Sequence, residues 1–231
     1  MKTVLITGAN RGLGLAFCQY YLAENWHVVA CCRHPDSSTA LLALAESSPH
    51  LRIEALEVTD FAQIDALGAK LSGIPIDILI NNAGIYPDTA SNALGHVDYA
   101  AWQQAFLVNT LAPVKLTETM LASLHLGRDK LIVCISSLMG SITDNTSGGS
   151  SYYRSSKAAL NAVMKNLSLS LQKDAVGVLI LHPGWVKTDM GGANALIDAD
   201  VSVRGMGQVI KEFTLTQSGQ FINYDGKILP W

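Results

Sequence analysis

Residues 3–14 read TVLITGANRGLG, a short apolar run that leads into glycines at positions 8, 12 and 14. The run predicts a buried strand, and the glycines fall where a helix should follow it. Glycine adopts positive φ angles and lets another group approach the main chain closely. A helix N-terminus adds free N–H groups and the positive end of its dipole, which suit a pyrophosphate. The stretch therefore predicts a dinucleotide site in a strand–helix turn, although such glycines often have only a structural role.

Outward from this turn, apolar runs alternate with longer helix-like segments. The runs are rich in Val, Ile and Leu without polar alternation, which is typical of strands buried on both faces of a parallel sheet. We expect strands at residues 3–7, 27–32, 51–56, 77–80, 130–135, 177–182 and about 220–222. We expect helices at about 12–24, 39–46, 61–71, 99–125, 151–173 and 202–213. The alternation predicts an α/β fold, a single Rossmann-like doubly wound domain over residues 1–231, with a mostly parallel seven-stranded sheet flanked by helices.

In such a sheet, ligands bind beyond the carboxyl ends of the strands, so the informative residues should follow the strands directly. The segment of about 184–201 holds three glycines and no long apolar run. It is predicted to form a loop or a short mobile helix over the site.

The composition excludes several classes of protein. The chain of 231 residues is 49% hydrophobic and 15% charged, which is too apolar for a disordered chain. A net charge of −3 without a Lys/Arg cluster argues against nucleic-acid binding. The apolar runs are too short for a signal sequence or a membrane span, so we expect a soluble, cytoplasmic protein. The four cysteines form no CxxC pair, and the histidines and acids show no metal-ligand spacing, so we expect neither a disulfide framework nor a catalytic metal.

The second expected strand bears on the choice of cofactor. NAD sites usually carry an acidic residue near the end of this strand, about 20 residues after the glycines. Here the strand is followed by Arg33, and no Asp or Glu comes after it before Asp36. A guanidinium suits a 2′-phosphate through bidentate hydrogen bonds, and Arg11 inside the glycine turn adds a second positive charge. These residues favour NADP(H) over NAD(H), whereas the alternative is two solvated arginines on loops.

Tyr153 and Lys157 are the candidate acid–base pair. Reduction of a carbonyl needs a proton donor at the developing alkoxide, and a free tyrosine has a pKa of about 10, too high for easy exchange at neutral pH. Four residues apart on a helix, the two side chains share one face, so Lys157 is expected to lower the Tyr153 pKa. Tyr152 is excluded because its partner four residues on is Ser156. A Tyr/Lys pair on a helix is usually ordinary surface, and the remaining motifs decide between these interpretations.

Two further residues fall where a site should form. Ser137 follows the strand expected at 130–135, where its hydroxyl can hydrogen-bond a substrate oxygen and the tyrosine. Neighbouring Ser136 has strand-end capping as its alternative role. Asn109 precedes Pro113 by four residues, and the missing N–H of proline leaves the Asn109 carbonyl without its helical partner. The alternative there is a simple kink in a long helix.

In their order along the chain, these motifs resemble the short-chain dehydrogenase/reductase family. The matching elements are Thr7 to Gly14, Asn81-Asn82-Ala83-Gly84, Asn109, Ser137, Tyr153 with Lys157, and Pro183-Gly184. One such motif could arise by chance, whereas the ordered set is specific and spans nearly the whole chain. Similarity to the carbonyl-reductase-like branch, which contains the sniffer and C-factor proteins, rests on Ser147-Gly148-Gly149, His182 to Met190, and Tyr224-Asp225-Gly226 to Pro230-Trp231.

The resemblance implies a role for each matching residue. Catalysis would use Asn109, Ser137, Tyr153 and Lys157, with Lys157 also reaching the cofactor ribose and the Asn109 carbonyl holding a water in a proton relay. Cofactor contacts would come from Gly8, Asn10, Arg11, Gly12, Leu13, Gly14, Arg33, Glu57, Val58, Asn81, Ala83, Gly84, Tyr153, Lys157, Pro183, Gly184, Val186 and Thr188. Glu57 departs from the Asp that the family often has beside the adenine, which leaves that contact to the main chain of Val58. Substrate contacts would come from Tyr86, Leu138, Met139, Trp185 and Met190, a set that suits an apolar or aromatic carbonyl compound, although core packing explains each equally well.

The sequence thus predicts an NADP(H)-dependent oxidoreductase, of carbonyl-reductase type, that interconverts a carbonyl and an alcohol by hydride transfer with Tyr153 as acid and base. The alternative is a cofactor-binding signalling or regulatory protein of C-factor type with little turnover, against which the complete Asn/Ser/Tyr/Lys set argues. A nucleotide-sugar epimerase or dehydratase is disfavoured because little chain follows residue 184. The expected partner is a small-molecule carbonyl or alcohol. The natural substrate, the direction of the reaction and the choice among monomer, homodimer and homotetramer stay open.

Overall fold

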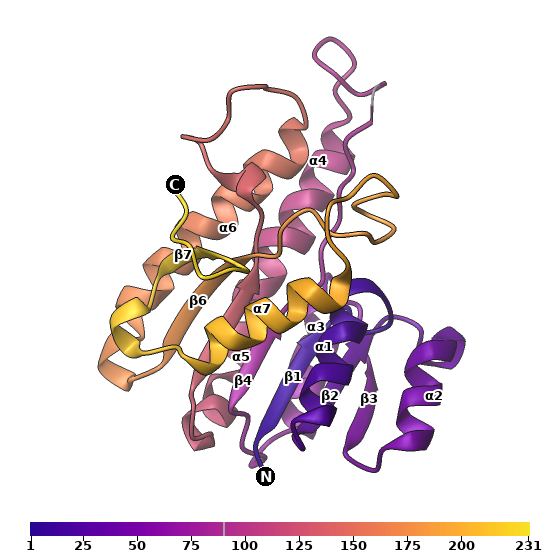
Figure 1. Cartoon of the computed structure of the whole chain (residues 1–231), viewed down its shortest axis with the longest axis vertical. Coiled ribbons are helices and arrows are strands. Elements are labelled where there is room, and N and C mark those ends of the chain that lie inside the picture. The colour runs from indigo at the N-terminus through magenta and orange to yellow at the C-terminus, as the bar shows by residue number, and fades with distance from the viewer. Residues whose placement is uncertain (90) are drawn as a thin grey trace.

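The computed structural model describes residues 1–89 and 91–231. The strands in this part of the chain are β1 (Thr3–Thr7), β2 (His27–Cys32), β3 (Leu51–Ala55), β4 (Ile78–Asn81), β5 (Leu131–Ile135), β6 (Gly177–His182) and β7 (Gln220–Asn223). They form one sheet in the order β3-β2-β1-β4-β5-β6-β7, and all of these neighbours pair in parallel (Figure 1). The order reverses between β1 and β4, the switch point at which doubly wound sheets bind ligands. The predicted Rossmann-like α/β fold is confirmed.

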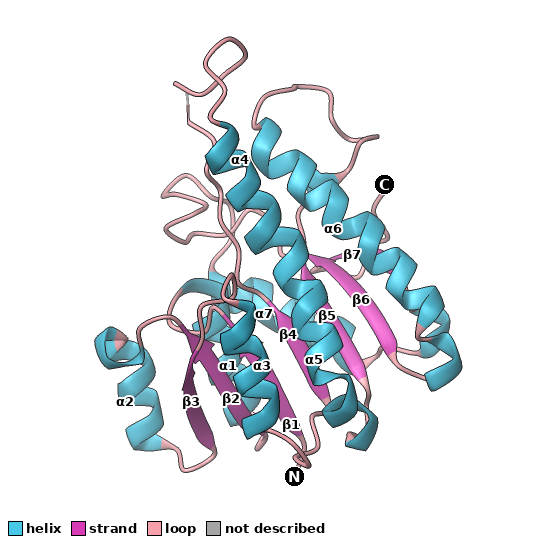
Figure 2. Cartoon of the chain, turned by 180° about the vertical axis from the view of Figure 1, so that it is seen from behind, coloured by secondary structure: helices cyan, strands magenta, loops and turns pink. Residues whose placement is uncertain are grey.

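Two layers of helices cover the sheet. The α-helices of the described residues are α1 (Gly12–Ala23), α2 (Thr39–Ser47), α3 (Phe61–Lys70), α4 (Tyr99–Phe106), α5 (Ala112–Leu126), α6 (Ser151–Ser170) and α7 (Ala199–Lys211). α1, α2 and α7 pack on the face seen in Figure 1, and α3, α5 and α6 pack on the face seen in Figure 2. Side chains alternate along a strand, so Val4 and Ile6 enter the first core and Leu5 the second. This two-sided burial explains why the strands are uninterrupted apolar runs.

The helix predicted over residues 99–125 needs a correction. α4 and α5 are separated by a π-helical turn, Leu107–Leu111, in which the N–H of Ala112 donates to the carbonyl of Leu107, five residues back. Pro113 lies in the first turn of α5, where its missing N–H is tolerated. The segment is therefore neither one regular helix nor a simple proline kink. Single π turns within helices are frequent at functional sites, and this one carries Asn109.

The other predicted helices differ from the structure only at their ends. α6 ends at Ser170 rather than 173 and is followed by a 3-10 turn, while α7 begins at Ala199 rather than 202. The segment after β6, predicted as a loop or a short helix, is an irregular loop. Within it the N–H of Lys187 donates to the Ile197 carbonyl at 2.9 Å, and the N–H of Leu196 donates to the Trp185 carbonyl at 3.0 Å. The loop thus folds back on itself before α7 starts.

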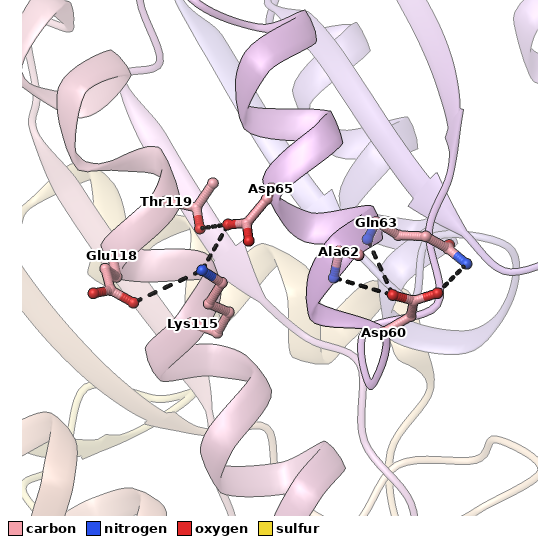
Figure 3. A network of polar contacts seen from close by, with 7 residues as sticks. All are labelled: Asp60, Ala62, Gln63, Asp65, Lys115, Glu118 and Thr119. Carbon is pink, nitrogen blue, oxygen red and sulfur yellow. Dashed lines mark hydrogen bonds and ion pairs between the residues drawn. The ribbon is translucent and has the colours of Figure 1, made fainter.

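Polar contacts fasten α3 to its neighbour α5 (Figure 3). Asp60 caps α3, because its Oδ1 accepts the N–H of Ala62 at 3.0 Å. On the facing surfaces, Lys115 Nζ pairs with Asp65 Oδ1 at 2.6 Å, and the Thr119 hydroxyl donates to the same oxygen at 3.3 Å. These contacts join α3 to α5, which continues directly from the π turn.

Three findings concern features that the described residues lack. No helix among them is long and apolar enough to cross a membrane. Across residues 1–89 and 91–231, no group of three or more His, Cys, Asp or Glu side chains is arranged to hold a metal ion. The cysteines, all of which lie in that part of the chain, are free and buried. Desolvation raises the pKa of the Cys134 thiol to about 12, so that thiol is an inert core group at neutral pH.

Candidate active site

The turn after β1 is braced by the turn after β4. Asn82 Nδ2 donates to the carbonyl oxygens of Thr7 at 2.8 Å and Gly8 at 3.2 Å. The Thr7 hydroxyl oxygen accepts the N–H groups of Asn82 and Ala83, each at 3.1 Å. Asn81 is 3% exposed and donates from Nδ2 to Cys134 Sγ at 3.6 Å, and its contact with a cofactor stays a prediction. Asn82 and Thr7 therefore brace the two turns against each other.

The glycine turn tolerates no side chain at its key positions. Gly8 and Gly12 have φ angles of 65° and 53°, in the left-handed region that favours glycine. A Cβ on Gly14 would lie 2.1 Å from the Gly8 carbonyl oxygen, so α1 can start this close to the turn only with glycine there. A Cβ on Gly12 would lie 3.3 Å from the methyl group of Thr188. The loop after β6 therefore lies against the glycine turn.

Both arginines predicted to select NADP(H) are paired with acids. The Arg11 side chain, 64% exposed, forms an ion pair with Asp189 of the loop after β6. The Arg33 side chain, 65% exposed, lies with Nη1 at 3.9 Å from Glu57 Oε2. Exposed pairs of this kind contribute about 0.2–1 kcal/mol, so a phosphate can replace either acid at small cost. Glu57 Oε1 also accepts the N–H of Thr59 at 3.0 Å, so the Glu57 carboxylate is directed toward the loop that contains both residues.

Tyr153 and Lys157 share the buried face of α6, as their spacing predicts. Lys157 Nζ lies 5.7 Å from the centre of the Tyr153 ring and donates to the Ile135 carbonyl, at the end of β5, at 2.8 Å. A Cβ on Gly140, in the short turn after Ser137, would come within 2.8 Å of the Lys157 main chain. A strand end, a tight turn and a helix thus converge on the lysine.

Tyr152 has a structural role instead. It is 1% exposed, and its hydroxyl donates to the Asn92 carbonyl at 3.1 Å while accepting the N–H of Asp98 at 2.6 Å. Its ring stacks on Trp102 with centroids 5.1 Å apart. Because these contacts engage the hydroxyl fully, the geometry agrees with the exclusion of Tyr152 from proton transfer.

The two serines after β5 point to different neighbours. The Ser136 hydroxyl donates to Asn161 Oδ1 at 2.5 Å and is 2% exposed. The Ser137 hydroxyl oxygen accepts the N–H of Met139 at 3.1 Å, and the Ser137 side chain acts on the Tyr153 hydroxyl, whose pKa it lowers. The second serine is therefore the one that acts on the tyrosine, and its contact with a substrate oxygen stays a prediction.

Asn109 is fully buried and lies at the centre of a hydrogen-bonded network. Its Oδ1 accepts the N–H of Ile85, and its Nδ2 donates to the Ile85 carbonyl and to Ser156 Oγ, all at 2.9 Å. A Cβ on Gly84 would lie 3.3 Å from Asn109 Oδ1 and 3.6 Å from Lys157 Nζ. The side chain therefore joins the loop after β4 to α6, beside the lysine. A proton relay through the Asn109 carbonyl stays a prediction.

Burial dominates the acid–base properties of the pair. Desolvation raises the pKa of Tyr153 to about 12, the hydrogen bond with Ser137 acts in the opposite direction, and Tyr86 adds to the rise. Desolvation also lowers the pKa of Lys157 to about 8. The net pKa of Tyr153 is therefore raised, so the lowering expected from Lys157 does not prevail among the protein's own groups. The physical reason is that Lys157 Nζ donates a hydrogen bond to the Ile135 carbonyl and lies 5.7 Å from the centre of the Tyr153 ring. The cost of burying a phenolate therefore prevails.

The predicted substrate contacts come from three segments of the chain. The Tyr86 ring is 40% exposed and packs against the Tyr153 ring with centroids 4.9 Å apart. Leu138 and Met139 form the short turn that follows Ser137. Trp185 and Met190 are about half exposed on the loop after β6, where Trp185 Nε1 donates to the Gly191 carbonyl at 2.8 Å. Tyr86 is thereby placed directly against the acid–base pair, while Trp185 and Met190 are held on the loop.

Sequence reasoning missed several residues that shape this site: Thr7, Asn82, Asp88, Ser156 and Asp189. Thr7 and Asn82 stood inside motifs that had been singled out, and the polarity of their side chains was an available signal. Asp88 and Asp189 had no local signal, because their partners lie 65 and 178 residues away in the chain.

Comparison with known proteins agrees with this geometry. A family model described as short chain dehydrogenase matches residues 2–196. The C-signal protein of Myxococcus xanthus is 44% identical over 157 residues, which are 68% of this chain and 93% of that protein. The carbonyl reductase Sniffer of D. melanogaster is 35% identical, with a TM-score of 0.94 over 100% of both chains. An NADPH-bound carbonyl reductase from chicken fatty liver is 37% identical, with a TM-score of 0.92 over 100% of this chain and 99% of that chain.

Three features together define a class of dinucleotide-dependent oxidoreductases. They are a glycine turn at the switch point of an α/β sheet, a Tyr/Lys pair on one helix, and a serine at the end of the strand before that helix. The chain belongs to the short-chain dehydrogenase family, as the resemblance of its motifs predicted.

Proposed function

We propose that the protein binds NADP(H) and interconverts a carbonyl and an alcohol, with Tyr153 as the proton donor and acceptor. The observation that carries this proposal is the convergence of Ser137, Tyr153 and Lys157 at the carboxyl edge of the sheet, where Gly84 and Asn109 also lie. Family membership supports the class of reaction. The NADPH bound to the chicken carbonyl reductase supports the choice of cofactor.

The residues present fit an NADP(H) molecule. Gly14 leaves the start of α1 open to a pyrophosphate, which a Cβ in contact with Gly8 would obstruct. Arg11 and Arg33 would hold the 2′-phosphate once their exposed carboxylate partners are displaced. Thr188, which lies against Gly12, and Val186 would hold the nicotinamide end. When bound, the cofactor supplies or accepts the hydride.

The chain's own groups then manage the proton. Ser137 hydrogen-bonds the carbonyl oxygen, which places that oxygen beside the Tyr153 hydroxyl. Because burial keeps Tyr153 protonated at neutral pH, it can donate its proton as the oxygen gains negative charge. The ammonium of Lys157 favours the tyrosinate that this step leaves behind. In the direction of alcohol oxidation, the tyrosinate takes the proton back.

The test is NADPH oxidation with a panel of ketones, aldehydes and quinones. We expect turnover of at least one of them, and a loss of about 10²–10⁴-fold in kcat in the Tyr153→Phe variant. Tyr99→Phe is the matched control, because Tyr99 is 68% exposed on α4 and should leave kcat unchanged. Turnover that survives Tyr153→Phe would show that the mechanism is wrong.

A second candidate function is a cofactor-binding regulatory protein with little turnover. The observation that favours it is the 44% identity to the C-signal protein. A regulator would need the glycine turn but not the Ser137, Tyr153 and Lys157 set. Tight NADPH binding without turnover of any compound in the panel would support this candidate and count against the enzymatic one.

A further inference from the structure

The helix that carries Tyr153 and Lys157 starts without a local cap. The residue before it, Ser150, adopts a left-handed conformation with φ 50°, and within the described residues its side chain makes no capping hydrogen bond. The first N–H groups of a helix have no partner inside the helix and need one elsewhere. In α6 this need falls on the turn that contains Tyr153 itself.

Asp88, in the segment between β4 and α4, meets this need from 65 residues away. One carboxylate oxygen accepts the N–H of Tyr152 at 3.0 Å, and the other accepts the N–H of Tyr153 at 2.8 Å. Charge-assisted hydrogen bonds of this kind are roughly twice as strong as neutral ones. The negative charge also faces the positive end of the helix dipole. A single side chain therefore both anchors the main chain of Tyr153 and adds a charge beside it.

The same segment brings Tyr86 to the site. Its ring packs on the Tyr153 ring, and its hydroxyl lies 2.5 Å from Ser150 Oγ, just before α6. Asp88 stands two residues further along. The contacts of Tyr86 and Asp88 together hold the segment against the start of α6.

We propose that Asp88 is a positioning residue for the reaction: it holds Tyr153 through the main-chain N–H, and its negative charge favours the neutral phenol over the phenolate. This inference rests on the proposed role of Tyr153 in proton transfer. Within the described residues, the charged and titratable groups near Tyr153 are Lys157 on α6, Tyr86 on the segment after β4, Asp88, which contacts the Tyr153 main chain, and, beyond Lys157, Cys134 on β5. Among these groups Asp88 is the carboxylate. Its negative charge opposes the stabilisation of the Tyr153 phenolate by the Lys157 ammonium.

Two substitutions separate the anchor from the charge. Asp88→Asn keeps an oxygen that can accept one of the two N–H groups but removes the negative charge. Asp88→Ala removes both functions. The matched control is Asp98→Ala, because Asp98 caps α4 from the same segment through the N–H of Ala101 at 3.0 Å and makes no hydrogen bond to Tyr153 among the described residues.

We expect Asp88→Asn to keep kcat within about threefold while the limb of its pH profile that reports Tyr153 moves down by about half a pH unit or more. We expect Asp88→Ala to lower kcat by about tenfold or more with little change in the KM for NADPH, because the defect lies at the proton donor. Asp98→Ala should show neither effect. Thermal unfolding of each variant identifies any loss that comes from misfolding.

A second readout does not depend on turnover. The ultraviolet absorbance of the Tyr153 phenolate, taken as the difference between a protein and its Tyr153→Phe counterpart, can be titrated with and without Asp88→Asn. The expected result is a lower titration midpoint without the carboxylate. Unchanged midpoints and wild-type kinetics in folded Asp88→Asn and Asp88→Ala variants overturn the role of Asp88. Full turnover in Tyr153→Phe overturns the proposed mechanism itself, so the two failures are distinguishable.

Discussion

Arg11 of the glycine turn forms an ion pair with Asp189, which lies in the loop between β6 and α7. The pair joins two segments that are far apart in the sequence and that meet at the cofactor end of the sheet. The Asp189 carboxylate pairs with the Arg11 guanidinium, which the sequence predicts to bind a 2′-phosphate. If Arg11 binds the 2′-phosphate as proposed, the cofactor and the loop compete for one cation, and the affinity for NADPH should depend on both.

The first prediction concerns that competition. Asp189→Asn removes the charge that pairs with Arg11, and an exposed ion pair contributes about 0.2–1 kcal/mol. We expect NADPH to bind up to about fivefold more tightly and NADH to bind unchanged, as measured by calorimetric titration. Asp198→Asn is the control, because Asp198 pairs with Lys187 on the same loop at 3.1 Å. Weaker NADPH binding in Asp189→Asn would mean that the pair orients Arg11 for the phosphate instead.

The second prediction concerns the choice between the two nicotinamide cofactors. Arg33 is largely exposed and only loosely paired with Glu57, so its guanidinium is available to a 2′-phosphate. We expect Arg33→Ala to weaken NADPH binding by about 10–100-fold and to leave NADH binding nearly unchanged. Arg204→Ala, an exposed arginine on α7, should alter neither affinity. A larger loss for NADH than for NADPH would contradict the role of Arg33.

The third prediction concerns stability in acid. His182 ends β6, and burial lowers its pKa from 6.5 to about 4, against the opposing effect of Asp144. Between these two values the unfolded chain binds more protons than the folded one, so stability that is present above about pH 6.5 is lost as the pH falls towards about 4. The loss from this residue should reach roughly 3 kcal/mol in the free energy of unfolding.

Urea unfolding at about pH 7 and about pH 4 measures this loss. His182→Gln should be less sensitive to acid than the wild type, whereas His125→Gln, an exposed histidine at the end of α5, should behave like the wild type. Equal sensitivity to acid in His182→Gln and the wild type would show that other groups are responsible.

The fold was predictable because most of its information is local. Strands such as β1 and β5 are buried on both faces, so each is an unbroken apolar run that differs plainly from the helices around it. The π turn at Leu107–Leu111 was not predictable, because Asn109 and Pro113 are equally compatible with a simple kink in a long helix. What accompanies the turn in the structure is the buried network of Asn109 with Ile85 and Ser156, which involves two other segments.

The candidate site divides in the same way. Tyr153 and Lys157 could be paired from their spacing alone, since a helix sets which side chains share a face. The pKa of Tyr153 could not, because it depends on how much water the rest of the fold excludes. Asn82, Asp88 and Asp189 act through partners on distant segments, and no pattern in their own neighbourhood revealed this.

The sequence by itself determined the order of strands and helices, the glycine turn, and the residues placed at the ends of strands. These follow from short-range rules on periodicity, main-chain freedom and helix spacing. Only the tertiary structure decided what surrounds those residues: Asp88 beneath the first turn of α6, Asp189 on Arg11, and the burial that keeps Tyr153 protonated. Hydrogen bonding, ion pairing and desolvation depend on distances in space, and these are settled only when segments far apart in the chain pack together.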